Sequence, residues 1–210
     1  MDTELFRTEP LNLMRIIPTE EKMKNSKLIT MIEGAIIAGV CVALSFIPLN
    51  TANASFDLSL GLIPLGVYAL RRGVLPGMAV GFVWGLLLIV LGKAYILAIP
   101  QVLLEYPVAF AFGGFGGILA PLLKRELSED RMGAALRAVV FAGIFAAVSR
   151  WFFHFLAGLI FWGSYAPEGM SPLVFSLVFN GTSAAANALM LAVMLPILFR
   201  AARPLFAAKH

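Results

Sequence analysis

Four ionisable side chains lie in or at the edge of apolar stretches of this chain: Glu33, Glu105, Arg150 and His154. An ionisable group inside a membrane helix is costly, so each one is expected to have a partner or a function. Glu33 lies near the start of the first apolar stretch, where we expect it to be solvated at the membrane interface. In the other stretches, a carboxylate and an imidazole could bind a polar ligand or exchange protons.

The spacing of polar residues places three of them at a similar depth. Pro100 is expected to open a helix, because proline favours the first helical turn, and Glu105 follows roughly 7.5 Å along the axis. His154 lies roughly 12 Å before Trp162, the expected end of its own helix, and Asn180 lies roughly 12 Å inside the last helix. A carboxylate, an imidazole and a carboxamide are therefore expected in the same half of a helix bundle.

One helix carries a repeated polar and aromatic face. Arg150, His154, Gly158 and Trp162 recur every four residues and so share one side of the helix. This face is typical of a pocket wall, although Trp162 alone could be an interfacial belt residue and His154 alone a structural histidine. Arg150 could also pair with Glu105 and fix its ionisation, and the sequence leaves both interpretations open.

Such a pocket suits a small, flat organic cation. Glu105 could neutralise its charge, and Trp162 could stack on its ring, a cation–π contact worth up to about 2 kcal/mol. Asn180 could donate and accept hydrogen bonds at a heterocycle edge. Tyr95 and Tyr106 could add aromatic walls and hydroxyl groups.

The composition indicates that these residues are carried by membrane helices. The chain has 210 residues, of which 60% are hydrophobic and 13% charged, whereas soluble domains have about 25% charged residues. We therefore predict an all-α membrane protein, a bundle of six transmembrane helices. The apolar segments are 29–47, 58–70, 74–92, 98–123, 133–162 and 172–199. Because 58–70 is too short to span a bilayer, either 48–57 enters the membrane beside it or this helix ends part-way and walls a cavity.

The distribution of Lys and Arg predicts the topology. If six helices alternate, the basic stretches share one side, and the positive-inside rule makes that side and both termini cytoplasmic. Basic residues at membrane borders also argue against a nucleic-acid partner. The expected domains are a flexible cytoplasmic segment at 1–28, the six-helix domain at 29–200 and a cytoplasmic tail at 201–210.

The residues discussed above lie in blocks that resemble the thiamine-specific substrate-binding subunits (S-components) of energy-coupling factor transporters. The resemblance covers about 29–200. The matching blocks are Leu70-Arg71-Arg72-Gly73, Trp84-Gly85, Gly92-Lys93-Ala94-Tyr95-Ile96-Leu97, Leu104-Glu105-Tyr106, Trp151-Phe152-Phe153-His154-Phe155-Leu156-Ala157-Gly158, Trp162, Phe175-Ser176 and Asn180-Gly181.

The resemblance implies a prokaryotic plasma-membrane protein that captures thiamine from outside and catalyses nothing. It would then dock on a transmembrane coupling protein driven by two cytoplasmic ATPases. The chain has no G-x-x-x-x-G-K-[ST] phosphate loop of its own, which agrees with ATP hydrolysis by partners. Neither a metal nor a cofactor is expected.

The resemblance also implies roles for individual residues. Glu105 would bind the thiazolium side of thiamine, with His154 and Trp162 stacking around it. The aminopyrimidine would be held by Asn180, Tyr95 and Phe175, and the remaining wall would be formed by Gly158 and Tyr106.

Three features depart from the family pattern. Phe175 stands where members commonly have tyrosine, and Arg150 stands where lysine is expected, which preserves the charge but not its geometry. The 48–59 loop lacks the tryptophan and glutamate that some members place there. Discrimination against thiamine phosphates and fragments is therefore left open by the sequence.

The first helix carries a smooth face of small residues, with Ala35, Gly39 and Ala43 recurring every four positions. The resemblance implies that this face meets the coupling protein. Close packing inside the chain is the alternative.

Two further functions are considered. The ligand could be a thiamine precursor or another flat heterocyclic vitamin. In a different class, an intramembrane enzyme could use His154 and Glu105 as acid and base, or Ser183 as nucleophile. No H-E-x-x-H or G-x-S-x-G motif supports the enzyme.

Overall fold

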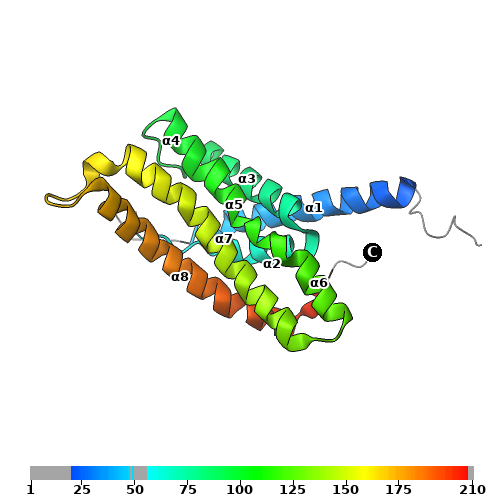
Figure 1. The fold of residues 1–210 in the computed structure, drawn as a ribbon. Coiled ribbons are helices and arrows are strands. Elements are labelled where there is room, and N and C mark those ends of the chain that lie inside the picture. Colours follow the sequence, from blue (N-terminus) through cyan, green and yellow to red (C-terminus); the bar gives the residue numbers. More distant parts are fainter. Residues whose placement is uncertain (1–19, 48, 50–55, 208–210) are drawn as a thin grey trace, which may run out of the picture.

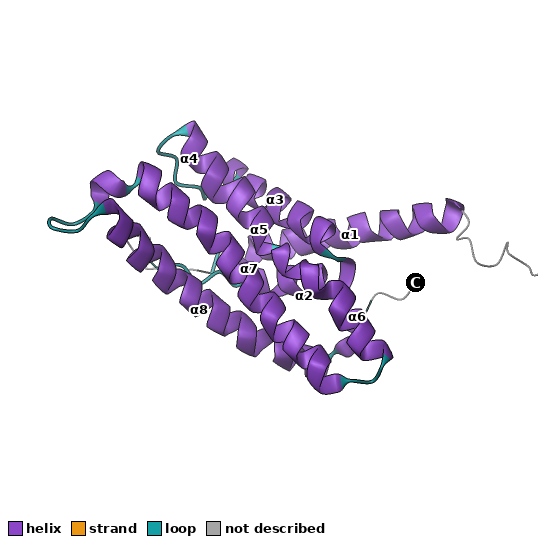
Figure 2. Ribbon diagram, in the orientation of Figure 1, coloured by secondary structure: helices purple, strands orange, loops and turns teal. Residues whose placement is uncertain are grey.

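The computed structural model describes residues 20–47, 49 and 56–207, and these form six helical segments (Figures 1 and 2). The prediction of an all-α, six-helix bundle is confirmed. The segments are α1 (Glu20–Leu44), α2 (Leu62–Arg72), α3 (Val74–Val90), a fourth segment spanning Ile99–Ser128, α7 (Met132–Phe161) and α8 (Pro172–Ala201). Short 3-10 turns, η4 (Gly163–Tyr165) and η5 (Arg203–Leu205), follow α7 and α8.

Four of these segments are long and apolar enough to cross a membrane: Lys24–Leu44, Ile99–Ser128, Met132–Phe161 and Pro172–Ala201. The α3 helix has 17 residues and the α2 helix only 11. Of the two alternatives for this stretch, the short α2 favours the helix that ends part-way beside a cavity, because its first residue, Leu62, and residues 57–60 before it line the cavity described below. Residues 48 and 50–55 of the preceding loop lie outside the described part of the chain.

The fourth segment is not one regular α-helix. It is divided into α4 (Ile99–Leu103), the π-helical η2 (Leu104–Val108), α5 (Ala109–Gly113), the 3-10 turn η3 (Phe115–Leu119) and α6 (Ala120–Ser128). Pro107 lies within the π-helical turn and has no N–H to donate to the ladder. The expected opening of this segment by Pro100 is confirmed.

Glycines on α3 allow the fourth segment to approach closely. A Cβ at Gly85 would lie 2.5 Å from the carbonyl oxygen of Tyr106 and 2.9 Å from the backbone nitrogen of Pro107. A Cβ at Gly81 would meet the backbone of Phe110 one turn later. Since these neighbours are backbone atoms, they could not yield to a side chain, and the glycine face therefore fixes the position of η2.

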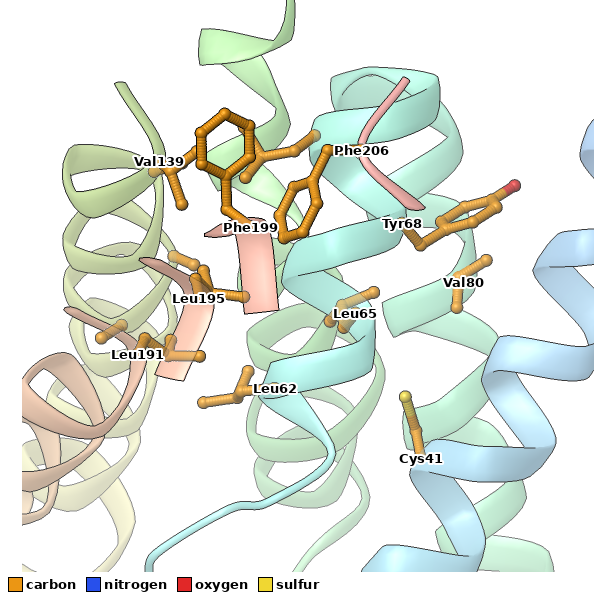
Figure 3. Packing of buried hydrophobic residues seen from close by; sticks show 14 of the residues in the cluster. Cys41, Leu62, Leu65, Tyr68, Val80, Val139, Leu191, Leu195, Phe199 and Phe206 are labelled. Carbon is orange, nitrogen blue, oxygen red and sulfur yellow. The ribbon is translucent and has the colours of Figure 1, made fainter. Parts of the chain in front are cut away.

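The hydrophobic core lies around α2, in the half of the bundle that holds the end of α8. Leu65 on α2 and Leu195 on α8 are fully buried or nearly so. Phe199 packs edge-on against Phe206, with ring centroids 5.4 Å apart (Figure 3). Phe206 belongs to the expected cytoplasmic tail yet is fully buried. Residues 1–19 and 208–210, the outer parts of the two expected terminal segments, lie outside the described residues.

An ion-pair cluster ties α1 to α2 and to the end of the chain. Glu33 accepts hydrogen bonds from Arg72 at 2.6 Å and from Arg71 at 3.2 Å. Arg71 also donates to the carbonyl oxygens of Pro204 and Ala207, at 2.8 and 2.7 Å. The expectation that Glu33 would simply be solvated is therefore wrong, because two arginines of the neighbouring helix reach it.

Candidate ligand-binding site

A cavity of about 880 Å³ opens in the half of the bundle opposite the Phe199 core. Its lining comes from the end of α1, the 56–62 segment, the fourth helical segment, α7 and α8. All nine residues expected at a ligand site line it: Tyr95, Glu105, Tyr106, Arg150, His154, Gly158, Trp162, Phe175 and Asn180. The fold therefore brings together the residues that helical periodicity and depth predicted and those, such as Phe175, that the resemblance implied.

Glu105 is held by two hydrogen-bond donors. Its carboxylate accepts a bond from the indole Nε1 of Trp162 at 2.8 Å and another from the side-chain amide of Gln101. Glu105 lies in the π-helical turn η2, a type of local widening that is frequent at functional sites. The helical rise used to place Glu105 from the sequence assumed a regular α-helix, which this turn is not.

Gln101, which positions Glu105 but is not among the residues that line the cavity, was missed by the sequence analysis. It is fully buried, and its amide also donates to the carbonyl oxygen of Tyr95 at 3.1 Å and accepts from the backbone N–H of Leu97 at 2.9 Å. Gln101 therefore joins the loop before α4 to the carboxylate of Glu105. Its position four residues before Glu105, on the same helix face, was the available signal.

Arg150 does not pair with Glu105, so that alternative is wrong. Its guanidinium Nη2 lies 3.5 Å from the carboxylate of Asp57, and its Cζ lies 4.3 Å from the ring centroid of Phe110, a cation–π contact. Only 6% of the residue is exposed. Asp57, in the segment before α2, is thus a second acidic residue of the cavity that the sequence analysis did not identify as a site residue.

Three buried polar atoms of cavity-lining residues on α7 have no hydrogen-bond partner within the described chain. They are Nε of Arg150, Nε1 of Trp151 and Nε2 of His154. Buried polar groups are nearly always paired, so unpaired ones call for an explanation. These three atoms lie along one helix whose residues line the cavity, and a polar ligand that displaces the side chains covering them could pair with them.

Aromatic rings form one rim of the cavity. The ring of Tyr95 lies 5.2 Å from that of Trp162, which lies 5.4 Å from Tyr165. The hydroxyl of Tyr106 accepts a hydrogen bond from the backbone N–H of Tyr95 at 3.0 Å, and its ring stacks on Phe110. Tyr95 and Tyr106 therefore form part of the cavity wall, and the Tyr106 hydroxyl also holds the loop before α4 in place.

The wall between α7 and α8 is tightly packed. Asn180 donates to the hydroxyl of Ser176 at 3.2 Å, and Ser176 donates to the carbonyl oxygen of Phe155 at 2.7 Å. A Cβ at Gly158 would lie 2.7 Å from the Asn180 amide nitrogen. Gly158 is thus needed for helix packing as well as for lining the cavity. Phe175 packs on Phe179, with ring centroids 4.6 Å apart.

The hydroxyl of Ser183 is engaged with backbone groups and not with His154. It donates to the carbonyl oxygen of Phe179 at 3.3 Å and accepts from the N–H of Asp57 at 3.1 Å. Nucleophilic activation needs an adjacent base, and none contacts Ser183 within the described residues. The geometry therefore gives no support to Ser183 as a nucleophile.

The small residues of α1 face outward. Ala35, Gly39 and Ala43 are exposed, and a Cβ at Gly39 would have no atom within 4 Å. The buried face of the same helix is formed instead by Gly34, Ala38 and Cys41. The alternative that the Ala35–Gly39–Ala43 face packs inside the chain is therefore wrong.

Known proteins match the chain over most of its length. Residues 31–207 match the family of thiamine transporter proteins. The thiamine transporter ThiT of Lacticaseibacillus paracasei is 38% identical over 191 residues, which cover 89% of this chain and 94% of that protein. ThiT of Bacillus subtilis is 29% identical over 181 residues, covering 85% and 94%.

A solved structure also matches. The structure of ThiT from Listeria monocytogenes superposes with a TM-score of 0.82 at 38% identity, and it covers 87% of this chain and all of that one. The sequence matches and the structural match each cover more than four fifths of this chain. The match is to a transport family and not to an enzyme family, and the chain belongs to the thiamine transporter protein family.

Proposed function

We propose that the chain is the membrane-embedded thiamine-binding subunit of an ATP-driven importer of the energy-coupling factor type. The proposal rests chiefly on one observation, the carboxylate of Glu105 held beside the indole of Trp162 at a cavity. Thiamine carries a permanent positive charge on a flat ring. A carboxylate can neutralise that charge, and aromatic rings can stack on it.

The surrounding groups support a heterocyclic cation with polar edges. The amide of Asn180 can hydrogen-bond to ring nitrogens or an amino group, and so can Nε2 of His154, which has no partner within the described residues. Ligand sites commonly combine apolar walls with a few polar groups in a cavity of about 300–1,000 Å³, and this cavity has about 880 Å³.

Calorimetric titration of the purified protein with thiamine tests the proposal. We expect saturable binding at one site per chain with quenching of tryptophan fluorescence, because Trp162 and Trp151 line the cavity. An absence of binding would contradict the proposal. A competition panel of thiamine, its aminopyrimidine precursor and other flat vitamins distinguishes thiamine from the alternative ligands, and release of unmodified thiamine would argue against turnover.

We propose that both termini are cytoplasmic and that the cavity opens outward in a prokaryotic plasma membrane. The asymmetric distribution of Lys and Arg supports this orientation. Cysteine labelling checks it: a cysteine at Ser164, in the exposed turn after α7, should react with a membrane-impermeant reagent in intact cells. A cysteine at Asp130, in the turn before α7, should not.

We propose that the Ala35–Gly39–Ala43 face docks on a transmembrane coupling protein that acts with two ATPases. The exposure of these small residues on α1 supports an intermolecular contact. Gly39→Leu is expected to abolish co-purification with the coupling protein and to leave thiamine affinity unchanged. Ile36→Leu, which alters an exposed residue beside that face, is the matched control. Retained co-purification of the Gly39→Leu variant would contradict the docking surface.

A further inference from the structure

The guanidinium of Arg150 is a buried cation with spare hydrogen-bonding capacity. Arginine has five N–H donors, but within the described chain the polar contact of Arg150 is a 3.5 Å approach of Nη2 to Asp57, and its Nε has no partner. The guanidinium also lies 4.3 Å from the ring centroid of Phe110. A buried arginine of this kind is well suited to bind a phosphate or carboxylate group.

Asp57 is the one carboxylate that approaches this guanidinium among the described residues. Glu105 is engaged by Gln101 and Trp162 instead. The other cation at the cavity, Lys93, lies 4.3 Å over the ring of Phe46 at the rim. The charge of Arg150 is therefore offset by Asp57 and by no other side chain described here.

Asp57 is held in place by a clamp on α8. Its backbone N–H donates to the hydroxyl of Ser183 at 3.1 Å, and its carbonyl oxygen accepts from the amide of Asn187 at 2.7 Å. The side-chain oxygen of Asn187 accepts from the N–H of Ser59 at 2.9 Å. Asn187 is 3% exposed. The clamp thus fixes the backbone on both sides of Leu58 and presents the Asp57 side chain to α7.

We propose that Asp57 is a specificity-determining residue, which makes the cavity prefer thiamine to its phosphate esters. The inference rests on the proposed function. The carboxylate of Asp57 lies beside the guanidinium of Arg150, where the phosphate of a ligand could otherwise form an ion pair. It also repels an incoming phosphate directly. With Asp57 removed, Arg150 becomes an uncompensated cation in a low-dielectric wall and attracts the phosphorylated ligand.

The test compares the dissociation constants of thiamine and thiamine monophosphate in the same protein preparation. In Asp57→Asn, the preference for thiamine, the ratio of the monophosphate Kd to the thiamine Kd, is expected to fall roughly tenfold, because a charge-assisted contact with phosphate becomes available. Asp57→Glu keeps the charge and should keep most of the preference. The double variant Asp57→Asn/Arg150→Met removes both charges and should restore a preference within about twofold of the wild type.

The outcomes separate the two proposals. Failure of the wild-type protein to bind thiamine would overturn the proposed function. If the wild type binds thiamine but Asp57→Asn leaves the preference unchanged or raises it, the role of Asp57 is overturned and the proposed function stands. Gel filtration and thermal unfolding in detergent report the folding of each variant independently of thiamine binding. Asn187→Ala provides a second route: it leaves both charges in place but releases the clamp, so the preference should fall by a smaller factor.

Discussion

The Glu33 ion-pair cluster and the α7 wall of the cavity differ in how completely their polar groups are paired. In the half of the bundle that holds the Phe199 core, the carboxylate of Glu33 is paired with two arginines, and Leu65, Leu195 and Phe199 are at most 1% exposed. Around the cavity, Arg150, Trp151 and His154 each keep a buried polar atom that has no partner among the residues that the structure describes. The paired groups of the first region stabilise the fold, whereas the unpaired atoms of α7 are candidates for pairing with a ligand.

The strongest test of this difference removes a large side chain from the packed half. Phe199→Ala deletes a ring that is 1% exposed, so we expect the free energy of unfolding to fall by about 3–5 kcal/mol. Thermal unfolding in detergent measures the change. Thiamine affinity of the folded fraction should stay the same, because Phe199 is not among the residues that line the cavity. If Phe199→Ala lowered thiamine affinity but left stability unchanged, the separation of the bundle into a packed half and a ligand-binding half would be contradicted.

A smaller loss is expected from the ion-pair cluster. Glu33→Gln leaves Arg71 and Arg72 without their carboxylate, and Arg72 has only 8% of its side chain exposed. Because Glu33 is partly solvated, we expect a loss of about 1–2 kcal/mol, between the values for exposed and buried pairs. Unfolding at low and high salt checks this: the difference in unfolding free energy between the wild type and Glu33→Gln should shrink as the salt concentration rises. A difference that is independent of salt would argue against an electrostatic origin.

The smallest change in stability should have the opposite sign. His154→Leu removes an imidazole nitrogen that is buried without a partner in the described part of the chain, so the ligand-free protein should gain about 1 kcal/mol. Thiamine affinity should fall at least tenfold if His154 contacts the ligand. Phe153→Leu on the same helix is the control, since Phe153 packs on Phe112 at 4.3 Å and its loss should destabilise. A destabilised His154→Leu protein with full affinity would show that His154 is structural.

Much of this arrangement could be predicted from the sequence because it follows helical periodicity. The four-residue spacing of Arg150, His154 and Trp162 placed them on one face, and the distances from the helix ends placed Glu105 and Asn180 at their level. Apolar length also identified the six helical segments, including the short α2. These features depend on local geometry, which repeats regularly along the chain.

The features that could not be predicted depend on contacts between distant segments. The π-helical turn at Glu105 combines Pro107 with the glycine face of α3, and neither pattern alone specifies it. The pairing of Arg150 with Asp57 joins a loop to a helix 93 residues away. The pairing of Glu33 with Arg71 and Arg72 likewise required knowing that α1 and α2 are neighbours.

The central claim is that the carboxylate of Glu105 recognises a positive charge on the ligand. The most direct measurement compares wild type and Glu105→Gln for two ligands: thiamine and an uncharged analogue with a thiophene ring in place of the thiazolium. We expect Glu105→Gln to weaken thiamine binding about 30-fold or more, or at least 2 kcal/mol, and to weaken binding of the uncharged analogue much less. An equal loss for both ligands would contradict charge recognition and reduce Glu105 to a hydrogen-bonding wall.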